Sequence, residues 1–493
     1  MENRTILSPD GYGFNFDNSY LQLPPVFHKR QQPTEVKNPS LALFNDSLAI
    51  SLGLNIDALK KHGAQLLSGN VLDQGANPIA QAYAGHQFGH FNILGDGRAI
   101  LLGEHITPNM QRFDIQLKGA GRTPYSRSGD GRAALGPMLR EYIMSEAMYA
   151  LGIPTTRSLA VVTTGEVVYR DDAYAGAVLT RVASSHVRVG TFQFAAANQN
   201  PQPLQALADY SISRHFPDIA DADNQYLELL KRMIDLQAAL LAKWMHVGFI
   251  HGVMNTDNMS ICGETIDYGP CAFINTYHHE TVFSSIDTNG RYAFGNQPKI
   301  AHWNLTRLAE SLLPLIDESE EKSIALANEC LAEYPNNFLE LWLSGMRKKL
   351  GIFNQEDDDI TLAEDLLMHM QKNKADFTNT FRSLGEEAVH HSALYQDAGF
   401  KNWLTLWKAR LARQNEPYDE SIRLMHTANP KVIPRNHLVE EALHAAVNDG
   451  DMKALHDLLL AVSNPYAELN HQSKYTQAPD PVFDQQYKTY CGT

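Results

Sequence analysis

The pattern of hydrophobic residues changes its period about 200 residues into this chain. Between about residues 91 and 190 apolar side chains alternate with polar ones, as at Phe113, Ile115 and Leu117. Such alternation is typical of half-buried strands. Farther along, apolar residues recur at helical spacing, as over 226–246. The sequence therefore predicts an α+β protein in which the strands come first and the helices follow.

The predicted elements follow this division. We expect strands over 100–103, 113–118, 158–163, 166–169 and 176–182, with a turn at Thr164-Gly165, and helices over 137–151, 226–246, 305–315, 361–373 and 437–448. This order, with polar motifs between the two parts, is the layout of a protein-kinase-like bilobal fold, with a strand-rich N-lobe and a mostly helical C-lobe. We therefore divide the chain into an N-terminal extension packed on the lobes (1–85), an N-lobe (86–190), a helical C-lobe with the catalytic and metal-binding loops (191–430), and C-terminal helices with a tail (431–493).

The charge of the chain limits its partners. A net charge of −15 over 493 residues disfavours a general nucleic-acid binder, because phosphate backbones are bound by clustered Lys and Arg. No apolar run reaches the roughly 18 residues needed to cross a bilayer. The first residues show neither a signal peptide nor a transit peptide. We therefore expect a cytoplasmic protein without nucleic-acid or membrane partners.

Positive charge is nevertheless concentrated in one region. Residues 98–188 contain 11 Lys or Arg and 8 Asp or Glu, a net of +3, which leaves −18 on the other 402 residues. Two Gly-Asp-Gly-Arg motifs, at 95–98 and 129–132, lie at or within this region. One such motif alone is better explained as a hairpin turn. Its repetition favours phosphate binding, because glycines let backbone N–H groups approach a phosphate and arginine adds a fixed charge.

A lysine and a glutamate stand at kinase-like positions. Lys118 ends a predicted strand, and Glu141 lies 23 residues later on the next predicted helix. In kinases such a lysine contacts phosphates and the glutamate holds it, although a solvent-exposed lysine and glutamate would look the same in the sequence. Arg181 and Arg188, seven residues apart after a later strand, are expected to reach the same cleft. A solvated loop is the alternative for both.

The strongest local motif is His251-Gly-Val-Met-Asn-Thr-Asp-Asn258, followed by Ile266-Asp-Tyr-Gly269. Sugar and aminoglycoside phosphotransferases use a similar loop, in which an Asn and a second Asp hold the divalent metal and a first Asp accepts the substrate proton. Asn258 and Asp267 stand at the metal-binding spacing. Val253 occupies the position of the usual base, and Asp257 is the obvious replacement. The alternative is a polar turn with a structural aspartate.

These motifs together resemble the SelO family, that is selenoprotein O and its bacterial YdiU homologues, which are protein nucleotidyltransferases with a pseudokinase-type fold. The residues that carry the resemblance are YAGHQFGHF (83–91), LGDGRA (94–99), QLKGAGRTPYSRSGDGRAALGP (116–137), TRVASSHVRVGTF (180–192), HGVMNTDNMSICGETIDYGPCAF (251–273) and NQPKIAHWNLTRLAESL (296–312). The resemblance runs from about residue 10 to the last few residues.

The resemblance implies a kinase-like fold that binds ATP in a reversed orientation, so that the alpha phosphate faces the attacking hydroxyl. It implies transfer of AMP, or of UMP from UTP, to Ser, Thr or Tyr hydroxyls of proteins with release of pyrophosphate. Nucleotide contacts are implied for Gly95, Gly97, Arg98, Lys118, Asp130, Gly131, Arg181, Arg188 and Asp267. Asp257 would accept the proton, and Glu141 would anchor Lys118. Asn258 and Asp267 would bind Mg²⁺ or Mn²⁺.

Eukaryotic members of this family carry selenocysteine close to the C-terminus, and this chain has Cys491 third from its end. Cys271 follows the Asp267-Tyr-Gly-Pro270 motif. We therefore hypothesise a Cys271–Cys491 disulfide that ties the tail across the catalytic lobe and makes activity depend on redox state. Two unrelated reduced thiols are the alternative.

Two other functions compete with nucleotide transfer. A small-molecule or protein kinase would transfer the gamma phosphate, and Val253 in place of its base argues against it. A pseudokinase scaffold would bind nucleotide without chemistry. The presence of Lys118, Asn258 and Asp267 together gives such a scaffold little reason to exist.

Overall fold

Antiparallel strands form one layer in the N-terminal part of the molecule. The computed structural model describes residues 11–198, 200–386, 392–468 and 473–490, and in these residues nine strands share one sheet in the order β1-β3-β5-β6-β9-β8-β2, with β4 paired to β3 and β7 to β9. The strands are β1 (His28–Arg30), β2 (Ser40–Phe44), β3 (Ile79–Gln87), β4 (His90–Gly95), β5 (Ala99–Ile106), β6 (Arg112–Lys118), β7 (Ala133–Ala134), β8 (Arg157–Tyr169) and β9 (Ala173–Ala183). The prediction that the strands come first and the helices follow is therefore confirmed.

Alternating side chains of the sheet enter two different cores. Ile100 and Leu102 of β5 pack with α1 (Asp46–Leu52) and α2 (Ile56–Leu67) on one face. Leu101, between them, packs with α3 (Leu135–Ala150) on the other face. Because successive strand residues point to opposite faces, the sheet is covered on both sides and its central strands are buried.

One predicted turn is absent, and this prediction is wrong. The segments 158–163 and 166–169 form the single strand β8, which pairs along β9 and shifts register between Thr163 and Val167. Gly165, inside this irregularity, has φ 68°. A residue in the left-handed region at this point produces a bulge that bends the strand without ending it. The dipeptide Thr164-Gly165 marks that bulge.

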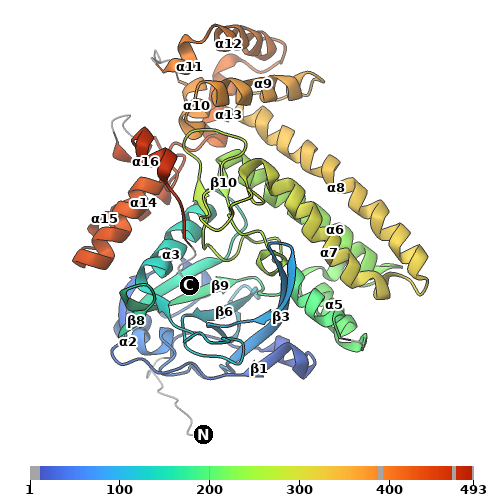
Figure 1. Ribbon diagram of the computed structural model, residues 1–493, viewed down its shortest axis with the longest axis vertical. Helices are drawn as coiled ribbons and strands as arrows, with labels where there is room; N and C mark the ends of the chain where they lie inside the picture. The colour runs from blue at the N-terminus through green and yellow to red at the C-terminus, as the bar shows by residue number, and fades with distance from the viewer. Residues whose placement is uncertain (1–10, 199, 387–391, 469–472, 491–493) are drawn as a thin grey trace.

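Helices make up most of the rest of the chain (Figure 1). They are α4 (Val189–Ala196), α5 (Gln202–His215), α6 (Gln225–Val247), α7 (Gln297–Ile316), α8 (Glu320–Lys349), α9 (Asp359–Lys372), α10 (Phe377–Leu384), α11 (Ala393–Gln396), α12 (Ala398–Leu411), α13 (Tyr418–Ala428), α14 (Asn436–His444), α15 (Lys453–Val462) and α16 (Pro481–Gln486). In Figure 1 the helices α6 to α8 lie beside one another, and α9 to α13 form a separate group at the top of the view. No helix in the described ranges is long and apolar enough to cross a membrane.

The chain between α6 and α7 connects the sheet to the helices. It contains the short strands β10 (Phe249–Ile250) and β11 (Ala272–Phe273), which pair antiparallel. The loop between these two strands holds the polar motif 251–269, and its Thr265 forms an isolated bridge with Thr155 just before β8. This connection brings the polar motif against the sheet, beside the start of β8 and the end of β9.

Candidate active site

Three cationic side chains converge on the carboxylate of Asp267. Lys118 Nζ lies 3.1 Å from Oδ1, an Arg181 guanidinium nitrogen lies 2.6 Å from the same oxygen, and Arg188 lies 2.8 Å from Oδ2. Asp267 has φ 63°, which lies in the left-handed region that residues other than glycine rarely adopt. Burial opposes ionisation, but these cations hold the pKa of Asp267 well below its usual range. A strained backbone and three charges on one carboxylate mark a functional site.

The predicted pair of Lys118 and Glu141 is present. Lys118 Nζ lies 2.6 Å from Glu141 Oε2, and Arg181 Nε donates to Glu141 Oε1 at 2.9 Å. Glu141 is fully buried on α3. Although burial raises its pKa, Arg181 and Lys118 outweigh that effect and lower it. A buried carboxylate thus fixes two of the three cations in place.

Sheet register explains why these cations meet. In the antiparallel pair of β6 and β9, Gln116 lies opposite Arg181 and Lys118 lies opposite Leu179. Residues two apart on a strand share a face, so Lys118 and Arg181 are diagonal neighbours on the same side of the sheet. The helix α3 covers that side and supplies Glu141.

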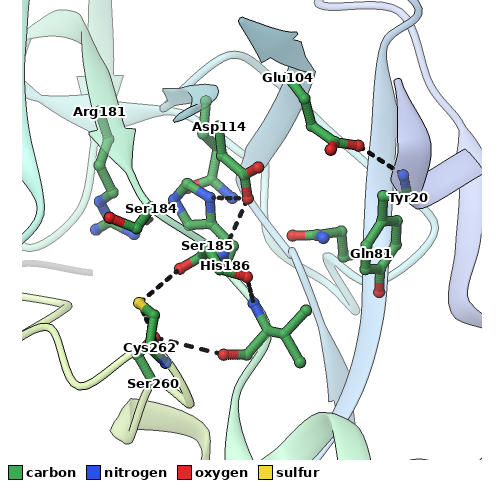
Figure 2. Close-up of polar contacts among 12 residues, drawn as sticks. Tyr20, Gln81, Glu104, Asp114, Arg181, Ser184, Ser185, His186, Ser260 and Cys262 are labelled. Carbon is green, nitrogen blue, oxygen red and sulfur yellow. Dashed lines mark hydrogen bonds and ion pairs between the residues drawn. The ribbon is translucent and has the colours of Figure 1, made fainter. Parts of the chain in front are cut away.

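A buried polar network supports the turn that carries Arg188. Figure 2 shows His186 beside Asp114 of β6. Asp114 Oδ2 accepts from the His186 backbone N–H at 2.9 Å and lies 3.0 Å from its Nδ1, while Arg214 of α5 bonds the other carboxylate oxygen at 2.7 Å. Burial alone would raise the pKa of Asp114, but Arg214 and His186 lower it. The ionised carboxylate therefore holds the chain just after β9 in one conformation.

Asp257 lies in a short 3₁₀ turn, Thr256–Asn258, beside this charge cluster. Its side chain is buried, and Oδ1 has no hydrogen-bond partner in the described structure. Oδ2 is 3.4 Å from Gln87 Nε2, and Arg188 donates to the Asp257 backbone oxygen at 2.7 Å. Burial raises the pKa of Asp257 to about 6, and Arg188 opposes part of that shift. An unsatisfied buried carboxylate with a raised pKa is a suitable proton acceptor.

The β3–β4 hairpin packs against the side chain of Asp257. A Cβ placed on Gly85 would lie 2.2 Å from Asp257 Oδ1, so only glycine allows this approach. The backbone N–H of His86 donates to Thr256 Oγ1 at 2.7 Å, and that of Phe88 donates to Asn255 Oδ1 at 3.1 Å. The tip of the hairpin is therefore bound to Asn255 and Thr256 beside Asp257.

The residues predicted to bind metal suit a cation that is shared with a substrate. Asn258 Nδ2 donates to the Val253 backbone oxygen at 2.9 Å, which leaves the amide oxygen to face the site. Asp267 supplies a carboxylate. In the described ranges no cluster of three His, Cys, Asp or Glu side chains forms a complete metal site. Mg²⁺ commonly takes only one or two protein oxygens and fills its other positions with phosphates and water, so these two residues fit such an ion.

The predicted glycine loops lie against each other at the mouth of the site. Gly95 packs under the Tyr125 ring, where a Cβ would lie 2.3 Å from a ring carbon. The Ser126 hydroxyl donates to the Gly97 backbone oxygen. Gly131 has φ 71°, and a Cβ there would lie 2.1 Å from Gly121 O. Close packing of the two loops is therefore one reason for these glycines.

Asp130 is exposed and paired. It forms two bonds to Arg170, of 2.9 and 3.0 Å, and accepts from the Arg132 backbone N–H. The hydrogen bonds from Arg170 lower the pKa of Asp130. An ionised carboxylate repels phosphate, so this position suits contact with a sugar or base better than contact with a phosphate.

One cavity of about 820 Å³ joins nearly all of these residues. Its walls include the predicted Gly95, Gly97, Arg98, Lys118, Asp130, Gly131, Arg181, Arg188, Asp257, Asn258 and Asp267. Glu141 lines an adjoining cavity that shares Lys118 and Arg98 with the first. A groove of about 1420 Å³ between α8, α9 and the C-terminal segment is larger, but it has no comparable convergence of charge.

The sequence did not single out three residues of this cavity. Tyr83 lies under Arg188, with the guanidinium carbon 4.6 Å from the ring centre. Gln87 contacts Asp257, as described above. Asp96 is buried, and burial raises its pKa to about 6. Tyr83 and Gln87 belong to the motif 83–91, and Asp96 belongs to the first Gly-Asp-Gly-Arg motif. The motifs therefore identified the right segments of the chain but gave no role to these three side chains.

The predicted disulfide involves a residue outside the described ranges. Cys271 is fully buried, and burial raises its pKa to about 12. Cys491 lies outside the described residues. The end of the described chain nevertheless approaches Cys271, because the Thr489 hydroxyl donates to the Pro270 backbone oxygen at 2.7 Å.

Comparison with known proteins places the chain in a family. The family model for protein adenylyltransferase SelO matches residues 12–463. A protein of Geobacillus kaustophilus (strain HTA426), named protein nucleotidyltransferase YdiU, is 59% identical over 482 residues, which cover 98% of this chain and 99% of that protein. A protein of Bacillus cereus (strain ATCC 10987 / NRS 248) with the same name is 58% identical over the same shares of both chains.

The matched range 12–463 extends over both the sheet and the helices. It contains the positions of Lys118, Glu141, Arg181, Arg188 and Asp267. The chain is therefore an enzyme of the protein nucleotidyltransferase class. It belongs to the SelO family, as the motifs of its sequence indicated.

Proposed function

We propose that this protein transfers AMP from ATP, or UMP from UTP, to Ser, Thr or Tyr hydroxyls of other proteins and releases pyrophosphate. The observation that carries the proposal is the cluster of Lys118, Arg181 and Arg188 beside the unpartnered carboxylate oxygen of Asp257. The cluster provides positive charge for a triphosphate, and Asp257 provides a proton acceptor next to it.

The fold we propose for this reaction is the protein-kinase-like bilobal one. The strands from β4 to β9 with α3 correspond to the N-lobe (86–190), and the helices α4 to α13 correspond to the C-lobe (191–430). Residues 1–85 are the N-terminal extension, which adds β1, β2 and most of β3 to the same sheet, and residues 431–493 are the C-terminal helices and tail. The paired Lys118 and Glu141 on strand and helix, and the catalytic turn followed by Asp267, support this assignment.

In this assignment the deep end of the cavity binds the beta and gamma phosphates. Lys118, Arg181 and Arg188 now neutralise Asp267, and they are the groups that phosphates would meet there. Arg98 and the glycine loops at Gly95, Gly97 and Gly131 line the same cavity. Asp130, at its mouth, would contact the ribose or base. This order places the alpha phosphate toward Asp257, as the family resemblance implies.

The chemistry then needs one proton transfer and one displacement. The acceptor hydroxyl oxygen forms a bond to the alpha phosphorus, the bond from that phosphorus to the bridging oxygen breaks, and pyrophosphate leaves. Asp257 takes the hydroxyl proton on its free oxygen. The cationic side chains stabilise the charge that develops on the departing pyrophosphate.

Asn258 and Asp267 are the residues that would hold the divalent metal, Mg²⁺ or Mn²⁺. When bound, such an ion neutralises phosphate charge and helps to orient the nucleotide. The left-handed backbone of Asp267 turns its carboxylate into the cavity, and the bond from Asn258 to Val253 fixes the orientation of the amide.

Labelled nucleotides distinguish this function from its competitors. Alpha-labelled ATP with Mg²⁺ or Mn²⁺ should label proteins of a cell lysate, and gamma-labelled ATP should not. Gamma label on an acceptor would instead identify a kinase. Such a kinase would need a base at another position, because Val253 occupies the position of the usual one. No label from either nucleotide would identify a nucleotide-binding scaffold.

Substitution of Asp267 tests the site. We expect Asp267→Ala to reduce alpha-label transfer by about 10²- to 10³-fold, a loss typical of removing one electrostatic group from an active site. Binding of free ATP should remain, because Lys118, Arg181 and Arg188 keep their charges. Transfer at the wild-type rate by a folded Asp267→Ala protein would remove this site assignment.

A further inference from the structure

The outer strand of the β3–β4 hairpin has an unpaired edge beside the candidate active site. In the described part of the chain β4 pairs with β3 alone, in antiparallel register from His90 opposite Gln87 to Gly95 opposite Ala82. At its Gly95 end Tyr125 packs against the strand. The rest of such an edge presents N–H and C=O groups that another extended segment can bond.

The side chains of β4 do not protect this edge. Phe91 is 45% exposed and Ile93 is 55% exposed, and both point to the same face of the hairpin. Exposed edges in proteins are normally protected by lysine, other charged residues or proline. The strand sequence His-Phe-Asn-Ile-Leu-Gly contains none of these. An apolar, unprotected edge is a surface suited to binding another strand.

The edge is held in a fixed position relative to the catalytic turn. The hairpin is bonded to Thr256 and Asn255 through its backbone, and the Phe88 ring packs on Tyr292 with centroids 5.1 Å apart. Opposite faces of the hairpin have different neighbours. Tyr83, Gln87 and Leu94 line the nucleotide cavity, whereas Phe91 lies on the face that also carries His86, 5.3 Å from its ring.

We propose that the free edge of β4 binds an extended segment of the protein that is to be modified, which adds to the hairpin as another strand. This inference rests on the proposed function, because it assigns the acceptor's docking surface. Strands pair about 4.8 Å apart, so the segment would run about 10 Å from β3, the strand that touches Asp257. Its end opposite His90 lies nearest to Gln87 and the catalytic turn.

Strand geometry also gives the sequence preference of such a segment. Alternate residues face the side of Phe91 and Ile93 and should be apolar, and the residues between them face the side of the nucleotide cavity. The backbone provides most of the bonds, so acceptors of different sequence can be accepted if they contain an extended segment with this alternation.

A synthetic strand tests the edge directly. The probe is a fluorescein-labelled octapeptide of alternating Val and Thr with a lysine at each end, and binding is followed by fluorescence polarisation. We expect Ile93→Lys to weaken binding at least tenfold. Leu460→Lys is the matched control, because Leu460 is 71% exposed on α15, and it should leave binding unchanged.

Backbone methylation supplies a second measurement. A peptide with N-methyl groups on the amides of one edge cannot bond through that edge, so one of the two methylation patterns should abolish binding and the other should not. Equal binding by wild type, Ile93→Lys and both methylated peptides would overturn the proposal. No measurable binding of the unmethylated peptide to wild type would overturn it as well.

Catalysis is measured in parallel, so that the two proposals can fail separately. Ile93→Lys should lower alpha-label transfer to lysate proteins at least fivefold and leave the dissociation constant of ATP unchanged. Absence of alpha-label transfer by wild type would overturn the proposed function. Full transfer by Ile93→Lys, with wild-type transfer intact, would overturn the docking surface alone.

Discussion

Single residues set the electrostatics of this site. The cavity has an excess of three positive charges, because seven basic and four acidic residues line it: Arg98, Lys118, Arg127, Arg132, Arg170, Arg181 and Arg188 against Asp96, Asp130, Asp257 and Asp267. In a protein of net charge −15, this excess lies inside a cavity where solvent screening is weak. A polyphosphate is thus attracted to the cavity while the outer surface repels it.

Gly85 provides a prediction at this scale. Gly85→Ala would place a methyl group 2.2 Å from Oδ1 of Asp257, the oxygen proposed to accept the proton, and the aspartate or the hairpin must move. We expect the kcat for label transfer to fall at least about 100-fold, because misplacement of a reacting group by about 1 Å has this effect. The dissociation constant of ATP should change little.

The matched control for this variant is Gly136→Ala. A Cβ at Gly136 would lie 3.7 Å from its nearest neighbour, Val447, and the residue is on a helix, where alanine is favoured over glycine. Normal kcat for Gly85→Ala in a folded protein would show that the close approach to Asp257 has no role in the reaction.

The types of the site residues could be predicted, but some of their contacts could not. Lys118, Glu141, Asn258 and Asp267 stand in motifs whose residue order implies a role. Gln87 reaches Asp257 across 170 residues of sequence, and no periodicity or spacing records such a contact. The contact becomes visible only when the fold places the hairpin against the turn Thr256–Asn258.

At the scale of elements, the long strands and helices followed from their hydrophobic periods. The helix predicted over 226–246 is α6, and the strand predicted over 113–118 is β6. The two strands predicted around Thr164-Gly165 proved to be one, because a glycine in the left-handed region fits a bulge as well as a turn. Local sequence cannot distinguish a turn from a bulge here, because β9 pairs with β8 both before and after Gly165.

The contact between the end of α8 and α10 provides a prediction about stability. Lys349 is buried, its amine lies 4.0 Å from the centre of the Phe381 ring, and burial lowers its pKa to about 7. Protonation of this amine opposes folding. We expect Lys349→Met to raise the free energy of unfolding by roughly 2–4 kcal/mol at pH 6, after allowance for the lost cation–π contact.

The pH dependence of this gain follows from the direction of the shift. The folded state loses the proton near pH 7 and the unfolded state near pH 10.4, so wild-type stability should rise between these values and the advantage of methionine should shrink. Chemical denaturation at pH 6 and pH 9 measures both, with the exposed Lys401→Met as control. An equal gain at the two pH values would contradict this account.

At the scale of the whole molecule, the C-terminal segment returns to the chain that follows Asp267. Thr489 bonds Pro270, and its backbone N–H donates to Phe283 O at 2.9 Å. The described chain ends at residue 490, so the Cys271–Cys491 disulfide stays a prediction.

Mass mapping tests that disulfide. Non-reduced digests of the oxidised protein should contain a linked peptide with Cys271 and Cys491, and reduction should release both. We expect Cys491→Ser to remove the linked peptide and to abolish any change of label transfer with redox potential. Cys330→Ser, on α8, is the control. Oxidised protein without the linked peptide would end the hypothesis.

The distance along the chain between Lys118 and Asp267 has a consequence for the newly made protein. The two residues are 149 positions apart, and at roughly 5–20 residues per second a ribosome needs about 7–30 s to add the intervening chain. The strands of the sheet are complete in sequence at Ala183, whereas Asp257, Asn258 and Asp267 are added later. In the proposed mechanism an unfinished chain therefore lacks its base and its metal ligands, and it cannot modify the hydroxyls that surround it during translation.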